Sequence, residues 1–260
     1  MSKIYTEMDI DTIYLTIGLK CNLRCKYCYQ YEDSGKSLYT TNTMVSDKVI
    51  SHIKRLVLLR PFTERNPITL CFWGGEPFLY FDVIKDIVEK LKDVPILSST
   101  VSNGTLLTQE IVNWCNENKL HVTISNDGPE TEKTRGVNVL ENPVLLNLIK
   151  QLNNCLIEST FSAYNYDYLR TYFYLRTKMD RHVGVHFNWL NCDEHTSPEL
   201  YSFDYDKYSE ALDRFFEHQF VLCKTKQFDA TLLQTIIPLA PRMTNPSKTL
   251  WPSCGQMRKK

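Results

Sequence analysis

Residues 12–28 read TIYLTIGLKCNLRCKYC, in which a run of β-branched and apolar side chains leads directly into three cysteines. The run over 12–19 predicts a β-strand, because Thr, Ile, Tyr and Leu favour the pleated, half-buried surface of a sheet. Cys21, Cys25 and Cys28 fall on the loop that follows this strand. The stretch therefore places three potential metal ligands at the carboxyl end of the first predicted strand.

Downstream of this stretch, the chain alternates short strand-like runs with longer amphipathic runs. Further strands are predicted over 68–73, 96–102, 121–125, 155–162 and 183–190, and helices over 44–59, 79–92, 108–118, 142–153, 164–179 and 206–224. Such alternation is typical of parallel strands joined by crossover helices. The sequence therefore predicts an α/β fold, a partial (βα)6 barrel with parallel strands, whose ligands gather at the carboxyl ends of the strands.

The composition is that of an ordinary globular protein. Of 260 residues, 43% are apolar and 23% are charged, and 30 Lys and Arg balance 30 Asp and Glu. No net basic field favours nucleic acid or an anionic membrane. The N-terminus lacks the basic flank and apolar run of a signal peptide, and no run reaches the ~18–20 apolar residues of a membrane span. We expect a cytoplasmic protein that binds neither nucleic acid nor membranes.

One barrel domain is expected over 1–237, because α/β barrels commonly run to ~200–250 residues as a single unit. The segment 238–260 is rich in Pro and lacks periodicity, which predicts a loop or the start of a further module. Without a secretion signal, the nine cysteines are expected to be reduced thiols or metal ligands. Four of them lie on apolar runs and are interpreted as small core residues: Cys71, Cys115, Cys155 and Cys223.

The triad of Cys21, Cys25 and Cys28 brings three thiols into eight residues. Thiolates are the ligands of iron–sulfur clusters, and three of them leave one iron of a four-iron cubane open. A zinc site would need a fourth ligand, and the next candidate, His52, lies within a predicted helix. A redox pair at Cys25 and Cys28 would leave Cys21 unexplained. An iron–sulfur cluster is therefore the favoured interpretation, with zinc and a redox pair as the alternatives.

The segment CNLRCKYC (21–28) resembles the CxxxCxxC motif of the radical SAM superfamily, including the aromatic residue before the third cysteine. The resemblance implies an enzyme with a [4Fe–4S] cluster on Cys21, Cys25 and Cys28, whose open iron is chelated by S-adenosylmethionine. It further implies reductive cleavage of that cofactor to methionine and a 5′-deoxyadenosyl radical, which abstracts hydrogen from a substrate. An electron donor such as a flavodoxin or ferredoxin is an implied partner.

Trp73-Gly74-Gly75-Glu76-Pro77 follows the second predicted strand. The two glycines permit close approach of the backbone to a ligand, and Pro77 suits the first turn of a helix. Glu76 on its own could simply cap that helix. Beside the cysteine triad, the segment resembles the GGEP motif of the same superfamily. The resemblance implies that Gly74, Gly75 and Glu76 bind the methionine part of the cofactor, with Glu76 on its ammonium group.

Three further cofactor contacts are implied by resemblance. SNGT (102–105) follows the third strand and resembles the TNGT segment of the superfamily, which assigns Ser102 and Asn103 to the cofactor; taken alone, it is a turn with a good N-cap. Leu190 occupies the place where the family lays an apolar residue against adenine, although a core residue is the alternative in a parallel strand. Tyr27 is expected near the adenine, mostly through its backbone.

SNDGP (125–129) ends the fourth predicted strand and resembles the S-[IL]-D-G-P segment of the sulfatase-maturating and peptide-modifying branch. The resemblance implies that Ser125 contacts the ribose and that Arg135 pairs with the cofactor carboxylate. Two departures stand out: Asn126 replaces an aliphatic residue, and the spacing from Ser125 to Arg135 is slightly shorter than usual. The alternative for Arg135 is an exposed surface arginine.

Members of this SPASM-type branch usually continue into a C-terminal domain that binds auxiliary clusters. WPSCG (251–255) resembles the start of such a domain, but Cys254 alone cannot close a cluster, so most of that domain is predicted to be lacking. We expect a radical SAM enzyme that modifies a peptide or protein, the alternative being a non-catalytic regulatory protein that binds the cluster and the cofactor. The tyrosines within 164–174 either face a peptide groove or cover a helix surface.

Overall fold

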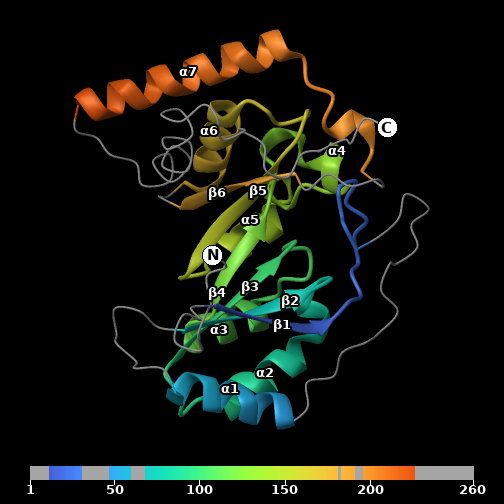
Figure 1. Cartoon of the computed structure of the whole chain (residues 1–260), viewed down its shortest axis with the longest axis vertical. Coiled ribbons are helices and arrows are strands. Elements are labelled where there is room, and N and C mark those ends of the chain that lie inside the picture. Colours follow the sequence, from blue (N-terminus) through green and yellow to red (C-terminus); the bar gives the residue numbers. More distant parts are fainter. Residues whose placement is uncertain (1–11, 31–46, 60–67, 181–182, 191–195, 226–260) are drawn as a thin grey trace, which may run out of the picture.

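Six strands form one parallel sheet in the order in which they occur in the chain, as Figure 1 shows. The computed structural model describes residues 12–30, 47–59, 68–180, 183–190 and 196–225. The strands are β1 (Thr12–Gly18), β2 (Ile68–Gly74), β3 (Ile96–Ser102), β4 (His121–Ser125), β5 (Cys155–Phe161) and β6 (Gly184–Trp189). The predicted α/β partial barrel with six parallel strands is therefore confirmed.

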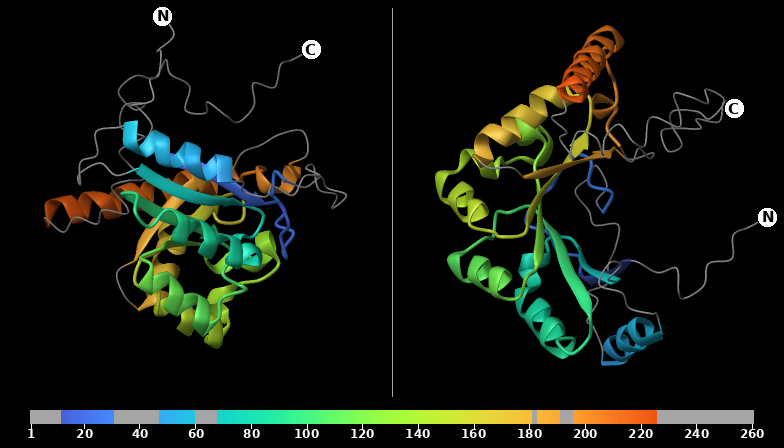
Figure 2. Two further views of the ribbon diagram at one scale, coloured as in Figure 1. Left: turned by 90° about the horizontal axis from the view of Figure 1, so that it is seen from below. Right: turned by 90° about the vertical axis from the view of Figure 1, so that its left-hand side faces the viewer.

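The helices cover the outer face of this curved sheet. Figure 2 shows α2, α3, α5 and α6 following one another along one side of it, and α7 packs against α6. The α-helices are α1 (Asp47–Leu59), α2 (Phe81–Lys90), α3 (Gln109–Glu117), α4 (Thr131–Arg135), α5 (Pro143–Lys150), α6 (Tyr168–Met179) and α7 (Tyr205–Lys224), and the 3-10 turns are η2 (Pro77–Tyr80), η3 (Gly128–Glu130), η4 (Val139–Glu141) and η5 (Pro198–Leu200). None of the helices in the described ranges is both long and apolar enough to cross a membrane.

The hydrophobic core lies between the sheet and these outer helices. Phe72 of β2, Ile124 of β4 and Ile157 of β5 have no exposed surface, and they belong to one buried cluster with Ile84 of α2 and Leu175 of α6. Burial of apolar surface on this side stabilises the sheet from one face only. The inner face and the carboxyl ends of the strands are thereby left for polar side chains.

Side-chain caps mark where α5 and α6 begin. The carboxamide oxygen of Asn142 accepts hydrogen bonds from the amides of Val144 and Leu145 at 3.0 and 3.2 Å, and Pro143 occupies the first turn of α5, the helix predicted over 142–153. The helix predicted over 164–179 begins four residues later than expected, because Asp167 caps α6. The prediction that residues 164–166 are helical was wrong.

The tyrosines of α6 serve mainly as core residues. Tyr168 and Tyr172 are 3% and 4% exposed, and the Tyr168 ring stacks on Phe161 of β5 with the ring centroids 4.9 Å apart. Tyr174 instead donates its hydroxyl hydrogen to Glu141 at 2.7 Å. The contacts of these tyrosines favour the interpretation as helix and core residues over a peptide groove.

Two of the remaining cysteines follow the interpretation as small core residues, and a third does so only in part. Cys71 of β2 and Cys115 of α3 are buried, and Cys155 at the start of β5 is half-buried. Three expectations lie outside the described residues: the side chain of Cys223, the boundary at residue 237, and the segment 238–260 with Cys254.

Candidate functional site: a cysteine-lined cavity at the sheet edge

An open cavity of about 270 Å³ lies at the carboxyl ends of the strands. The structure brings all twelve predicted site residues to its wall: Cys21, Cys25, Tyr27, Cys28, Gly74, Gly75, Glu76, Ser102, Asn103, Ser125, Arg135 and Leu190. They come from six separate segments of the chain, because the carboxyl ends of parallel strands meet at one edge of the sheet. This shared wall is the geometric basis for treating the four motifs as one site.

The cysteine loop leaves β1 and is held in place by backbone contacts. The amide of Lys26 donates to the carbonyl of Thr134 at the end of α4 (2.8 Å), and the amide of Cys28 donates to the carbonyl of Cys25 (3.0 Å). The Arg24 guanidinium donates to the carbonyl of Cys21 at 2.9 Å. The three thiols are therefore presented by a loop that is tied to α4.

The donor set fits an iron–sulfur cluster. Burial raises the pKa of the Cys25 thiol to about 11, and the neighbouring Arg135 acts in the opposite direction. Thiol ligands must lose their protons to bind metal, so a cationic metal centre would supply the stabilisation that these buried groups lack. Within the described ranges, no three His, Cys, Asp or Glu side chains are grouped tightly enough to hold a single metal ion. A four-iron cluster sets its thiolates on different irons and so spaces them more widely than one zinc ion does.

The two glycines after β2 let the backbone of this strand approach the end of β1. A Cβ on Gly74, whose φ is +148°, would lie 1.9 Å from the carbonyl oxygen of Gly18, and one on Gly75 would lie 2.2 Å from that of Lys20. The same approach allows the amide of Gly75 to donate to Gly18 (3.0 Å) and that of Glu76 to Lys20 (2.9 Å). Side chains are thus excluded by neighbouring backbone, independently of any ligand.

Glu76 is both a helix cap and part of the cavity wall. Its side chain is 1% exposed, and Oε1 accepts hydrogen bonds from the amide of Phe78 (3.1 Å) and the hydroxyl of Ser102 (2.8 Å), while Oε2 accepts one from the amide of Asn103 (2.8 Å). Burial raises the pKa of Glu76, and the three donated hydrogen bonds oppose that rise. A cation in the cavity would favour the ionised form. The capping interpretation and the ligand interpretation are therefore compatible.

Asn103 joins the cysteine loop to the β3 end. Its side-chain amide donates to the Asn22 carboxamide oxygen at 2.9 Å and lies 3.9 Å from the Cys21 sulfur. Its own carboxamide oxygen accepts hydrogen bonds from the amide and hydroxyl of Thr105 at 2.9 and 2.6 Å. The segment after β3 consequently orients Glu76 through the Asn103 backbone and the cysteine loop through the Asn103 side chain.

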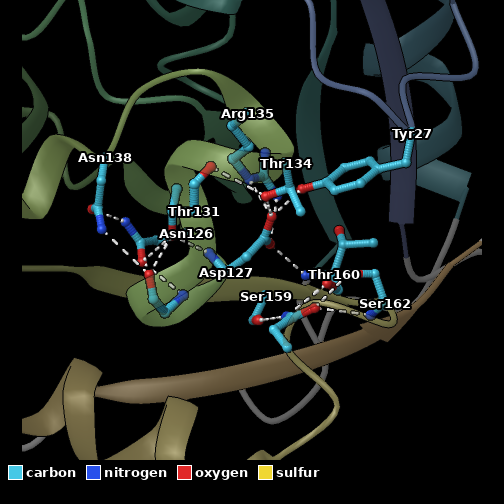
Figure 3. Close-up of polar contacts among 12 residues, drawn as sticks. Tyr27, Asn126, Asp127, Thr131, Thr134, Arg135, Asn138, Ser159, Thr160 and Ser162 are labelled. Atoms are coloured by element: carbon cyan, nitrogen blue, oxygen red, sulfur yellow. Dashed lines mark hydrogen bonds and ion pairs between the residues drawn. The ribbon is translucent and has the colours of Figure 1, made fainter. Parts of the chain in front are cut away.

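Arg135 lies inside the protein, paired with Asp127. The side chain is 9% exposed, and its Nε and Nη2 contact the two carboxylate oxygens of Asp127 at 3.1 and 3.2 Å, as Figure 3 shows. The surface alternative for Arg135 was therefore wrong. Asp127 also accepts hydrogen bonds from Tyr27 (2.6 Å), Thr134 (2.6 Å) and the amide of Thr160 (2.8 Å). The expected bond from Arg135 to a cofactor carboxylate would be made by a guanidinium that Asp127 already holds in place.

Tyr27 contributes its side chain to this network as well as its backbone to the loop. The ring lies beneath the Arg135 guanidinium, 5.2 Å from centroid to Cζ, and burial raises the pKa of its hydroxyl well above the ordinary value. Since Tyr27 stands between Cys25 and Cys28, the contact with Asp127 fixes the middle of the cysteine loop.

Asn126, the departure from the family pattern, is fully buried and hydrogen-bonded. Its amide donates to Asn138 at 2.8 Å, and its oxygen accepts from the amide of Gly128 and the hydroxyl of Thr131 at 3.0 Å each (Figure 3). An aliphatic side chain could make none of these contacts. A polar residue at this position is thus accommodated by the turn after β4, where Asn138 supplies the matching partner.

Seven residues of the cavity wall were not predicted from the sequence: Tyr29, Gln30, Trp73, Val101, Glu158, Thr160 and Asn188. Glu158 of β5 accepts a hydrogen bond from Asn188 of β6, and one of its carboxylate oxygens lies 3.6 Å from His186. A period-two alternation along β5 and β6, ending at the carboxyl edge, is the signal that could have identified Glu158 and Asn188. Thr160, two residues after Glu158 on β5, carries the same signal, and the other four carry none.

The fold and the site define a class: partial-barrel proteins that present three cysteines and a buried carboxylate to one cavity. The radical SAM superfamily model matches residues 15–182, more than half of the chain, and the protein belongs to this superfamily. The predicted resemblance is thereby confirmed. Membership implies S-adenosylmethionine and a [4Fe–4S] cluster as the cofactors.

Several relatives belong to the predicted branch. The radical SAM cyclopropyl synthase TigE of Paramaledivibacter caminithermalis is 25% identical over 183 residues, which are 65% of this chain and 39% of TigE. The cysteine-type anaerobic sulfatase-maturating enzyme of Clostridium perfringens is 31% identical over 117 residues, which are 42% of this chain and 30% of that enzyme. The chain therefore spans well under half the length of these two relatives.

A solved structure shares the fold. Native anSMEcpe with bound AdoMet superimposes with a TM-score of 0.63 at 20% identity, over 83% of this chain and 62% of that one. A structure of the same protein with AdoMet and the Cp18Cys peptide gives a TM-score of 0.61 at 21% identity, over 83% of this chain and 61% of that one. The likeness supports the six-stranded partial barrel.

Proposed function

We propose that the chain is a radical SAM enzyme that abstracts hydrogen from a peptide or protein. The observation that carries the proposal is the convergence of Cys21, Cys25, Cys28 and Glu76 on one cavity at the carboxyl edge of the sheet. The three thiols would hold a [4Fe–4S] cluster, and the cavity beside it would hold S-adenosylmethionine. The chemistry supplied when both are bound is one-electron reduction of the sulfonium, which breaks its C5′–S bond and yields methionine and a 5′-deoxyadenosyl radical.

The chain's own residues would bind and orient the two groups. Glu76, held by three hydrogen bonds, presents a carboxylate to the methionine ammonium. Ser125 at the end of β4 would contact the ribose, and Arg135, clamped by Asp127, would face the carboxylate. Leu190, which is 5% exposed, would line the adenine side. Such fixed positions hold the reacting carbon against one hydrogen of the substrate.

The peptide or protein substrate is supported by the relatives. The relatives include sulfatase-maturating enzymes, and anSMEcpe has been solved with a bound peptide. An electron donor such as a flavodoxin or ferredoxin completes the proposal, since the cluster must receive one electron for each cleavage.

Anaerobic reconstitution and product analysis test the proposal. Reconstitution with iron and sulfide should give a brown protein with about four irons per chain. Reduction with dithionite in the presence of S-adenosylmethionine should then release 5′-deoxyadenosine, and Cys25→Ala should abolish the release. Cluster and cofactor binding without release would favour the non-catalytic regulatory alternative. A colourless protein that retains zinc would refute the proposal.

A further inference from the structure

Gln30 is a buried residue of the cavity wall that no motif singles out. It follows Cys28 by two positions, at the end of the cysteine loop, and its residue surface is 5% exposed. It lines the cavity together with Cys28, Trp73 and Gly74. A polar side chain so placed must find its hydrogen-bond partners within the protein or in a ligand.

The orientation of the Gln30 carboxamide is fixed by Gly74. Nε2 donates to the Gly74 carbonyl oxygen at 2.7 Å. A carbonyl oxygen only accepts, so exchanging the oxygen and nitrogen of Gln30 would bring two acceptors together. Oε1 is therefore the carboxamide atom that does not contact Gly74, and it is buried without a hydrogen-bond partner.

An unpartnered buried acceptor on a cavity wall needs a hydrogen-bond donor, which water or a ligand can supply. The charges around the cavity favour a cationic donor. Cys21, Cys25 and Cys28 would be anionic as metal ligands, and the charge of Arg135 is already compensated by the bidentate contact with Asp127. A hydrogen-bond donor that also carries positive charge is stabilised by these surroundings.

Glu76 leaves room for a further acceptor. A carboxylate has about four lone-pair positions, and Glu76 already uses three of them for Phe78, Ser102 and Asn103. An ammonium group brings three N–H donors. Glu76 can therefore satisfy only part of an ammonium, and the remaining donors need acceptors elsewhere on the same wall.

We propose that Gln30 Oε1 accepts a hydrogen bond from the ammonium group of S-adenosylmethionine, and that Gln30 thereby extends the subsite formed by Gly74, Gly75 and Glu76. The inference rests on the proposed function, because it assigns a residue to the cofactor of that same site. A donor on the substrate would be the other source of the same chemistry.

The test measures the affinity of the reconstituted protein for S-adenosylmethionine by anaerobic equilibrium dialysis. Gln30→Met keeps the volume of the side chain and removes the acceptor. It should weaken binding about tenfold, which corresponds to about 1.4 kcal/mol. An analogue that lacks the α-amino group should bind the parent protein and Gln30→Met alike, because it offers no donor to Oε1.

Gln219→Met is the matched control. Gln219 is a glutamine of α7 that is 4% exposed, has an unpartnered Nε2 and does not line the cavity. This substitution should leave the affinity for the cofactor unchanged. Iron content and the circular dichroism spectrum show whether each variant retains its cluster and fold. If Gln30→Met loses its cluster or its fold, Gln30→Asn replaces it in the comparison. Gln30→Asn keeps the side-chain amide but shortens its reach.

Three outcomes would overturn the assignment. Unchanged affinity in the variant means that water satisfies Oε1. Equal weakening for the cofactor and the deamino analogue means that Gln30 acts only through Gly74. Weakened binding of a substrate peptide alone places the donor on the substrate. Failure of the parent protein itself to bind S-adenosylmethionine would instead refute the proposed function.

Discussion

Replacing Asp127 by asparagine should unfold the protein more easily and weaken its hold on iron. Asp127 is fully buried and accepts hydrogen bonds from Tyr27, Thr134, Thr160 and both ends of the Arg135 guanidinium. Asp127→Asn keeps the shape of the side chain but removes its charge and one acceptor oxygen. Arg135 is then left as a buried cation without its counter-charge.

The expected loss of folding stability follows from that uncompensated charge. Breaking one side of a buried ion pair costs about 3–5 kcal/mol. For a chain of this size, the loss corresponds to a fall in melting temperature of about 6–20 °C. Urea denaturation of the metal-free protein measures the free energy of unfolding. Because Tyr27 lies within the cysteine loop, iron bound after reconstitution should fall as well.

Two further variants give this prediction its controls. Asp82→Asn removes a carboxylate that is 94% exposed and paired with Lys85, so it should change stability by less than about 0.5 kcal/mol. Asp127→Asn combined with Arg135→Met removes both charges and should recover part of the loss. The reasoning is refuted if Asp127→Asn costs no more than Asp82→Asn, since the buried guanidinium would then not depend on Asp127.

Two other predictions concern backbone packing and pH. Gly75→Ala should destabilise the fold by about 1–3 kcal/mol and lower iron retention, because its Cβ would lie 2.2 Å from the Lys20 carbonyl oxygen. Gly136 has a φ of +82°, and a Cβ added there would have no neighbour within 4 Å. Gly136→Ala should therefore cost only the backbone strain of about 1–2 kcal/mol and leave iron binding intact. Equal iron loss in both glycine variants would contradict this prediction. Glu158 raises the pKa of His186 above its ordinary value of 6.5, so the protonated form stabilises the fold below that value, and the contribution is lost as pH rises through the raised pKa. Urea titrations on either side of this window should show a smaller pH dependence for His186→Gln than for the parent protein, and an unchanged dependence would exclude the His186–Glu158 contact as its cause.

Much of the fold could be read from local patterns. Each predicted strand corresponds to an observed one, and the start of the helix predicted from residue 142 agrees with α5, which Asn142 caps. The start of α6 was misplaced because the tyrosine-rich run before it is equally compatible with a helix. The Asp167 carboxylate accepts a hydrogen bond from the Arg170 amide, and this contact fixes the first turn of α6. It competes with a helix that would begin earlier in the chain.

The candidate site was predictable to the level of motifs but not of contacts. CNLRCKYC, GGEP and SNDGP each lie next to a strand end, so their meeting at one edge followed from the parallel topology. The burial of Arg135 did not follow, because an arginine ten residues after Ser125 has no preferred partner until α4 brings it to Asp127. Gln30 carried no pattern that distinguishes it from an ordinary loop residue.

By itself, the sequence determined the class of the protein: alternating strand and helix periodicity indicated the parallel sheet, and the spacing of Cys21, Cys25 and Cys28 predicted the cluster ligands. Only the tertiary structure decided which atoms meet. Glu76 contacts Ser102 and Asn103, and Gln30 contacts Gly74, across 26 to 44 residues of intervening chain. Such contacts depend on the register and curvature of the whole sheet, which local propensity does not specify. The carboxylate is therefore held, and the glutamine oxygen left without a partner, by packing between distant segments.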